Sequence, residues 1–114
     1  MLLYEATNWI VETLNTSVDE EFNSLPPDMR ARLVRIASLI ESVGLEKVHE
    51  PHIKHLEGPL WEIRMIGKSG IARAIYVTAT KQQIIIVRAF VKKTQKTPRR
   101  EIELALRHAN EILP

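Results

Sequence analysis

The fold of this protein is predicted by one stretch of its sequence, LWEIRMIGKSGIARAIYVTATKQQIIIVRAFVK, residues 60–92. Apolar residues recur there at alternate positions or in short runs, and Gly67-Lys-Ser-Gly70 and Lys81-Gln82 separate the runs. Alternation between short turns is typical of antiparallel strands. We therefore expect three neighbouring strands, over residues 60–66, 71–80 and 84–92.

The two turn lengths determine which residues lie opposite each other across these strands. Counting outward from a four-residue and a two-residue turn gives the pairs Ile66–Ile71, Arg64–Arg73, Glu62–Ile75, Thr80–Gln83, Ile75–Arg88 and Arg73–Phe90. One face then collects Glu62, Arg64, Arg73, Arg88, Phe90 and Lys92, with the apolar Ile75, Val77, Ile84 and Ile86 beside them. The other face is expected to pack on helices and holds Trp61, Ile63, Met65, Ala74, Tyr76, Ile85, Val87, Ala89 and Val91. Because like charges directly opposite each other destabilise a sheet, the charged face is expected to bind an anion.

The segment before the three strands predicts one strand and two helices. Moderate β character indicates a strand near Trp9 to Leu14. Ser17-Val-Asp-Glu20 has the pattern of a capping box that begins a short helix, which Pro26 ends. A second helix is predicted from Pro27 to Gly44, since Pro is tolerated in a first helical turn and Gly terminates helices. These two helices are expected to form a hairpin, and residues 45–59 are interpreted as a linker.

After the three strands, Thr97-Pro98 predicts the start of a closing helix, with Thr97 as the cap. The buried stripe of this helix is expected to consist of Ile102, Ala105, Leu106, Ala109 and Leu113. The predicted fold is therefore α+β, a single domain over residues 1–114. It has an antiparallel-rich sheet of about four strands, an N-terminal helical hairpin and a C-terminal helix.

Composition excludes several classes of protein. The chain has 114 residues and no cysteine, so it has no disulfide, no thiol nucleophile and no cysteine-ligated metal. Its apolar runs are far shorter than the roughly 20 residues of a membrane-spanning helix. The first residues lack the basic start of a secretory signal, and we expect a cytoplasmic protein.

Charge is distributed very unevenly along the chain. Residues 63–100 contain ten Lys or Arg and no Asp or Glu, whereas residues 1–62 have a net charge of −6. A block of this kind suits a polyanion, because each cation that neutralises a phosphate also releases condensed counterions. Nucleic acid is the leading ligand class, although such residues can also only solubilise a sheet face and protect its edges.

Three segments together resemble a known family. They are Leu56-Glu-Gly-Pro-Leu-Trp-Glu-Ile-Arg64, Arg73 on the next strand, and Arg88-Ala-Phe-Val-Lys-Lys-Thr-Gln-Lys-Thr-Pro98 before the final helix. This order resembles the RelE/ParE toxin superfamily, most closely its phage-derived HigB-like branch. The resemblance implies a RelE-like fold and the toxin of a type II toxin–antitoxin pair. It further implies a metal-independent endoribonuclease without a cofactor, acting on mRNA in the ribosomal A site and neutralised by an antitoxin, commonly of the helix-turn-helix type.

The resemblance also implies roles for individual residues. Arg73 and Arg88 are assigned to the scissile phosphate, Arg64 to orientation or charge stabilisation, and Phe90 to stacking on a base. Further RNA contacts are assigned to Lys54, Lys68, Lys92, Lys93 and Lys96. Relatives often place a His, Tyr or carboxylate near the end of the last strand, where this chain has Phe90 and lysines. Glu62 and His55 are the available substitutes as general acid and base.

Other interpretations remain open. His49, His52 and His55 are spaced by three, but Pro51 interrupts any helix that would align them, so a solvated loop is favoured over a metal site. Trp61 is expected to be a core residue. The alternative functions are a ParE-like inhibitor of DNA gyrase, and a nucleic-acid or antitoxin-binding module with weak or no catalysis.

Overall fold

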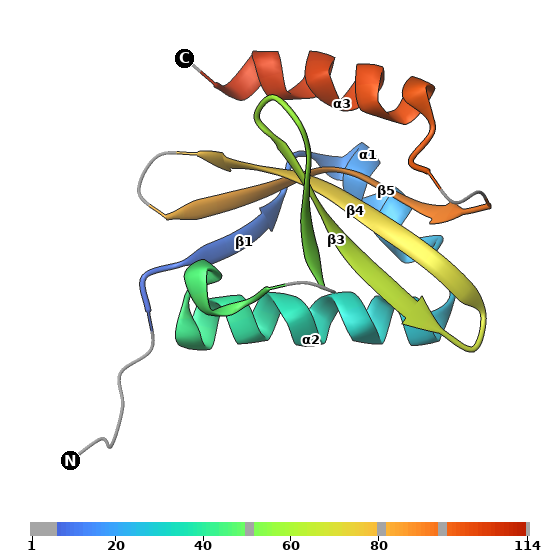
Figure 1. The fold of residues 1–114 in the computed structure, drawn as a ribbon, viewed down its shortest axis with the longest axis horizontal. Helices are drawn as coiled ribbons and strands as arrows, with labels where there is room; N and C mark the ends of the chain where they lie inside the picture. Colours follow the sequence, from blue (N-terminus) through green and yellow to red (C-terminus); the bar gives the residue numbers. More distant parts are fainter. Residues whose placement is uncertain (1–6, 50–51, 80–81, 94–95, 114) are drawn as a thin grey trace.

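A five-stranded sheet with helices on both faces forms the centre of the computed structural model, which describes residues 7–49, 52–79, 82–93 and 96–113. The elements are β1 (Ile10–Thr13), α1 (Thr16–Asn23), α2 (Pro27–Val43), the 3-10 helix η1 (Leu45–Lys47), β2 (Ile53–Glu57), β3 (Leu60–Gly67), β4 (Gly70–Ala79), β5 (Gln83–Lys92) and α3 (Arg99–Ile112). The strand order is β1-β5-β4-β3-β2, and only β1 runs parallel to its neighbour. Helix α2 lies below the sheet and α3 above it in Figure 1. The α+β class is confirmed.

Each face of the sheet has its own hydrophobic core. The core under α1 and α2 includes Met29, Ile40, Ile63, Met65 and Tyr76. The core under α3 includes Leu60, Ile75, Val77, Val87 and Ala105. Helix α1 packs mainly against β5 and α2 mainly against β3, and both helices contribute to one core on this face of the sheet.

The register of β3 against β4 is as predicted. Arg64 lies opposite Arg73, Glu62 opposite Ile75 and Ile66 opposite Ile71. The turn determines this register locally, because Gly70 has a φ of 122°, a conformation that favours glycine. Asp28 on α2 also holds the turn, since its Oδ2 accepts a hydrogen bond of 3.0 Å from the amide of Ser69.

The register of β4 against β5 contains a bulge that the sequence does not indicate. Gln83 pairs with Ala79, not with Thr80 as predicted, and Thr80 itself lies outside the described residues. Between the pairs Ile75–Arg88 and Tyr76–Ile86 the register shifts by one residue, which leaves Val87 as the extra residue. The pairing of Gln83 with Ala79 shifts the register by one residue, and the bulge shifts it back by one. The predicted pairs Ile75–Arg88 and Arg73–Phe90 are therefore confirmed.

The bulge also exchanges the faces of the residues between it and the loop. Ile84 and Ile86, expected on the charged face, belong to the core under α1 and α2. Ile85 and Val87, expected on the opposite face, pack toward α3. One extra residue reverses which side of a strand each side chain occupies, because the side-chain period of a strand is two.

Strand β2 was predicted as part of a linker, which is wrong. It pairs with β3 through Ile53–Ile63, Lys54–Glu62 and His55–Trp61, and so makes five strands of the expected four. An edge strand pairs on one side only, and polar residues are common there. Because Lys54 and His55 are both exposed, the sequence of this strand lacks the alternation of apolar and polar residues that predicts a strand.

Helix ends agree with the sequence except at two caps. Helix α2 begins at Pro27 and ends before Gly44, whose φ is 94°, as predicted. The cap of α1 is Asn15, whose Oδ1 accepts a 3.0 Å hydrogen bond from the amide of Val18, whereas the predicted cap Ser17 lies within the helix. Thr97 does not cap α3 either, because Pro98 occupies that position. Within the described ranges, no helix is long and apolar enough to cross a membrane.

The cap of α1 can be tested by comparing Asn15→Ala with Ser17→Ala. Loss of the Asn15 cap removes the partner of an amide at the helix start, so the free energy of unfolding should fall by about 1 kcal/mol. Ser17→Ala should change it by less than about 0.5 kcal/mol. Urea unfolding followed by circular dichroism measures both, and the reverse ranking would restore Ser17 as the cap.

Candidate functional site

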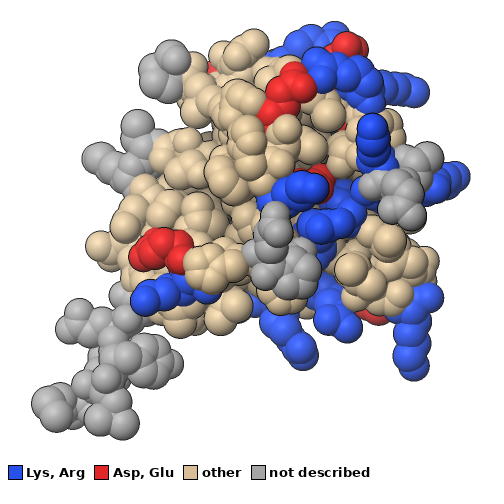
Figure 2. Space-filling model, viewed as in Figure 1, with Lys and Arg blue, Asp and Glu red and all other residues tan. Residues whose placement is uncertain are grey.

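A cleft of about 300 Å³ lies where β2, β3 and the end of β5 meet the segment leading into α3. Its lining consists of Lys54, His55, Leu56, Glu62, Arg64, Lys92, Lys96, Thr97 and Ile102. Six of the eleven predicted site residues are in this set, although they come from three strands and a loop. Basic side chains are more numerous than acidic ones in the lining, and Glu62 is its only acid. Figure 2 shows Lys and Arg gathered over the middle and one side of this face of the molecule.

A buried ion pair forms the floor of this cleft. Glu62 is 4% exposed and Arg73 is 1% exposed, and Glu62 Oε1 lies 3.4 Å from Arg73 Nε. The second oxygen, Oε2, accepts a 2.8 Å hydrogen bond from the hydroxyl of Thr97. Arg73 Nη1 also donates to the backbone oxygen of Ala72. Both oxygens of Glu62 therefore have cationic or hydrogen-bonding neighbours, and its negative charge is balanced beneath the cleft.

The cleft has a positive electrostatic character. Burial lowers the pKa of the Arg73 guanidinium, while the neighbouring carboxylate of Glu62 opposes that shift. Burial likewise lowers the pKa of the Lys92 ammonium, and the charge of Arg73 lowers it further. A lowered pKa means that the surroundings of a cation disfavour its charged form, here through burial and through repulsion by neighbouring cations. An anion bound in the cleft would offset that repulsion.

His55 lies at one side of the cleft with a defined orientation. Its Nε2 is 3.0 Å from the backbone oxygen of Gly58, so Nε2 holds the ring proton in the neutral tautomer and Nδ1 has the lone pair. The ring also packs edge-on against Trp61, with centroids 4.9 Å apart. Trp61 is 39% exposed, so the prediction that it is a core residue is wrong. Its neighbour toward the edge of the sheet is His55 of the short strand β2.

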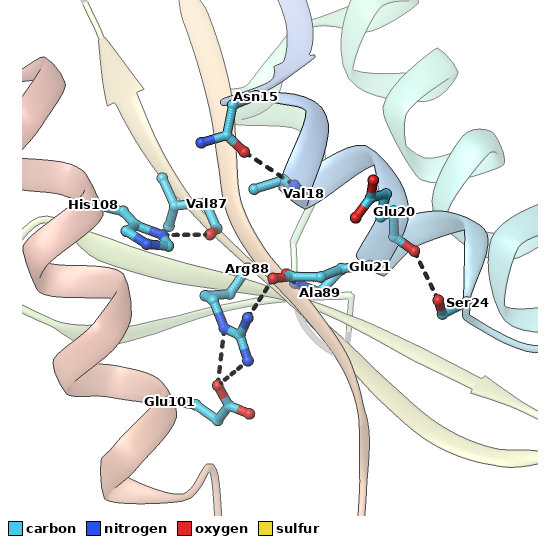
Figure 3. A network of polar contacts seen from close by, with 10 residues as sticks. All are labelled: Asn15, Val18, Glu20, Glu21, Ser24, Val87, Arg88, Ala89, Glu101 and His108. Carbon is cyan, nitrogen blue, oxygen red and sulfur yellow. Dashed lines mark hydrogen bonds and ion pairs between the residues drawn. The ribbon is translucent and has the colours of Figure 1, made fainter.

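Arg88 lies outside the lining of the cleft and joins three elements. Its guanidinium, on β5, forms ion pairs with Glu21 of α1 and Glu101 of α3 (Figure 3). Glu21 Oε1 also accepts a 2.9 Å hydrogen bond from the amide of Ala89. His108 Nδ1 lies 3.0 Å from the oxygen of Val87, the bulged residue. Side chains of α1 and α3 thus satisfy backbone groups of β5 beside the bulge, and Arg88 links both helices to the strand.

The other predicted contact residues lie around the cleft rather than in it. Phe90 is half-buried, packs toward α3 and borders a hollow beside α1. Lys93 is exposed just beyond β5, and Lys68 is exposed in the turn between β3 and β4. Sequence reasoning missed Thr97 as a site residue, because the Thr-Pro pattern indicates a helix cap. Among the described residues, no three His, Asp or Glu side chains are grouped so that they could hold a metal ion.

The sheet order, the two helical layers and the basic cleft define the class as a small α+β protein of RelE fold. The free-state structure of the E. coli toxin RelE, in a double arginine-to-alanine mutant, matches with a TM-score of 0.62 and 13% identity, over 94% of this chain and 100% of that one. A chain of the archaeal RelE–RelB complex from Pyrococcus horikoshii OT3 matches with a TM-score of 0.53 and 23% identity, over 75% of this chain and 96% of that one. No curated protein matches the sequence.

The family profile described as "Phage derived protein Gp49-like (DUF891)" matches residues 20–110. The chain therefore belongs to this Gp49-like family of phage-derived proteins, and its fold is that of RelE.

The buried ion pair can be tested by replacing Glu62 with Gln, which keeps the shape and the hydrogen bond from Thr97. Arg73 then remains buried without a counter-charge, and the free energy of unfolding should fall by about 3–5 kcal/mol. Glu57→Gln is the matched control, because it removes an ion pair with the exposed Arg99 and should change stability little. Equal urea midpoints for the two variants would contradict a structural role for the pair.

Proposed function

We propose that this protein is the toxin of a type II toxin–antitoxin pair and that it cleaves mRNA in the ribosomal A site. The observation that supports this most is the basic cleft, whose single acid is neutralised by Arg73 from below. Membership of the Gp49-like family and the RelE fold point the same way. RNA is a polyanion, and a cleft with three lysines and an arginine matches its backbone.

The reaction we propose is attack of the substrate's own 2′-hydroxyl on the adjacent phosphorus. The bond from phosphorus to the 5′-oxygen breaks, leaving a 2′,3′-cyclic phosphate and a 5′-hydroxyl. The protein has to accept the 2′-hydroxyl proton, stabilise the extra negative charge of the transition state and donate a proton to the leaving oxygen. In the proposed reaction Arg64, Lys54 and Lys96, which line the cleft, stabilise that charge.

His55 and Lys92 are suited to the two proton transfers. The Nδ1 lone pair of His55 can accept the 2′-hydroxyl proton, because the contact with Gly58 occupies Nε2. Lys92 can donate to the leaving 5′-oxygen, since its lowered pKa makes its ammonium a better acid than an ordinary lysine. Glu62 then has a positioning role, because its oxygens are engaged with Arg73 and Thr97.

The two arginines assigned to the scissile phosphate, Arg73 and Arg88, both have carboxylate partners within the protein. Arg73 lies beneath the cleft and supports its positive charge from a buried position. Arg88 can reach a phosphate only by exchanging Glu21 and Glu101 for it. Their direct contact with RNA stays a prediction, and so does base stacking by Phe90.

An antitoxin is the protein partner we propose. The solved archaeal complex contains RelE together with RelB, and this chain matches one of its chains over three quarters of its own length. The resemblance of the sequence to the HigB-like branch favours an antitoxin of the helix-turn-helix type.

The proposed activity can be tested by induced expression of the wild type, Arg64→Gln and the control Arg107→Gln, whose residue is exposed on α3. Pulse labelling reports protein synthesis, and primer extension maps new mRNA 5′ ends. The wild type and the control should arrest translation and produce new ends within translated codons, whereas Arg64→Gln should lose at least about tenfold of this activity.

Other outcomes distinguish the alternatives. Intact mRNA with a DNA-damage response after wild-type expression would contradict cleavage and favour a gyrase inhibitor. Intact mRNA with neither effect would favour a binding module without catalysis. Activity of Arg64→Gln equal to that of the control would place the reaction outside this cleft.

A further inference from the structure

A second basic hollow of about 300 Å³ lies on the α2 side of Arg64. Its lining consists of Arg32, Arg35, Ile36, His52, Arg64 and Ile66. Three guanidinium groups and an imidazole thus surround one space, and no acid is present in the lining. Arg32 and Arg35 are three residues apart, a spacing that places both on one side of the helix.

Arg64 belongs to both hollows because of where β2 begins. The first residue of β2, Ile53, pairs with Ile63, and the amide of Arg64 donates a 2.8 Å hydrogen bond to the oxygen of His52 just before it. Beyond that bond β3 is itself the edge of the sheet. The side chain of Arg64 therefore lies between the α3 side, with its cleft, and the α2 side, with the second hollow.

The arginines of this hollow have no counter-charge, whereas three other arginines of the chain do. Arg73 pairs with Glu62, Arg88 with Glu21 and Glu101, and Arg99 with Glu57 and Glu103. Across the described part of the chain, the structure records no ion pair or side-chain hydrogen bond for the three arginines of the hollow. Arg64 Nε is even buried without a hydrogen-bond partner there. Because a buried donor without an acceptor is costly, this nitrogen indicates a place for an acceptor from outside the chain.

We propose that this hollow binds a second phosphate of the same RNA strand, so that the strand passes from the cleft over Arg64 to Arg32 and Arg35 on α2. The inference rests on the proposed function and adds the direction of the RNA path. Guanidinium groups suit phosphate because their planar donors match its oxygens. Figure 2 shows Lys and Arg side chains from the region of α3, across the middle of this face, to the lower edge where α2 lies.

A nucleic acid fits this arrangement better than an acidic protein segment. The phosphates of a nucleic acid repeat regularly along one strand. Two of them can therefore occupy the cleft and the second hollow, which share Arg64. The apolar part of the lining, the buried Ile36 and the 55% exposed Ile66, can contact a ribose or a base between phosphates. A peptide would need carboxylates at matching positions and its own backbone partners.

The test compares Arg32→Gln/Arg35→Gln with the charge-matched control Lys47→Gln/Arg107→Gln, in which both residues are exposed and neither lines a hollow described above. The probe is a fluorescent 12-nucleotide RNA with 2′-O-methyl groups, which binds without being cleaved. Fluorescence anisotropy over a range of salt concentrations gives the affinity. Loss of the one phosphate held in this hollow should reduce the slope of log K against log salt by about 0.7, and weaken binding about tenfold at low salt. The control should match the wild type.

Several outcomes overturn the inference. Equal slopes for the two double variants would contradict the RNA path while leaving the proposed function intact. A normal RNA slope together with lost binding of a fluorescent polyglutamate peptide would assign the hollow to an acidic protein. Absence of RNA binding by the wild type would contradict the proposed function as well. Arg32→Lys/Arg35→Lys should retain most of the slope, which separates loss of charge from loss of fold.

Discussion

The buried ion pair between Glu62 and Arg73 joins β3 to β4 beneath the cleft and reaches the segment that leads into α3. Two charges that are almost inaccessible to water are tolerated only when each compensates the other and remaining polar atoms have partners. Thr97 supplies one such partner and so fixes the segment that leads into α3. The pair also neutralises the only acid among the cleft residues, and it therefore determines that the cleft is basic at its surface.

Arginines have two kinds of environment in this protein, and the difference separates structural from functional candidates. Arg88 links β5 to α1 and α3 through Glu21 and Glu101, and the same helices satisfy backbone groups beside the bulge. Arg32, Arg35 and Arg64 surround a hollow without a carboxylate. Unneutralised cations close together repel each other and reduce stability, so an arrangement of this kind is better explained by an anionic ligand than by the needs of folding.

The RelE fold persists here at low sequence identity because its determinants are few: a twisted sheet, two cores and short turns. The proposed chemistry is less constrained by the fold. Near the end of the last strand this chain has Phe90 and lysines instead of the His, Tyr or carboxylate that the resemblance implies. In the proposed reaction His55, from the edge strand β2, and Lys92, at the end of β5, supply the proton-transfer groups. Both positions border the same cleft, so a change of residue type need not move the site.

The pairing of β3 with β4, the bounds of α2 and the concentration of positive charge can be read from the sequence, because turns, prolines, glycines and alternation act between near neighbours. The sequence also indicated that Arg64, Glu62 and Lys92 lie close together, because the register of the strands places them on one face of the sheet. Four other features are visible only in the folded chain: β2 is a strand, β5 is bulged, Arg88 is paired with acids of two helices, and Arg32 and Arg35 lie near Arg64. These features depend on contacts between segments distant in the chain, where packing and charge compensation outweigh local preference.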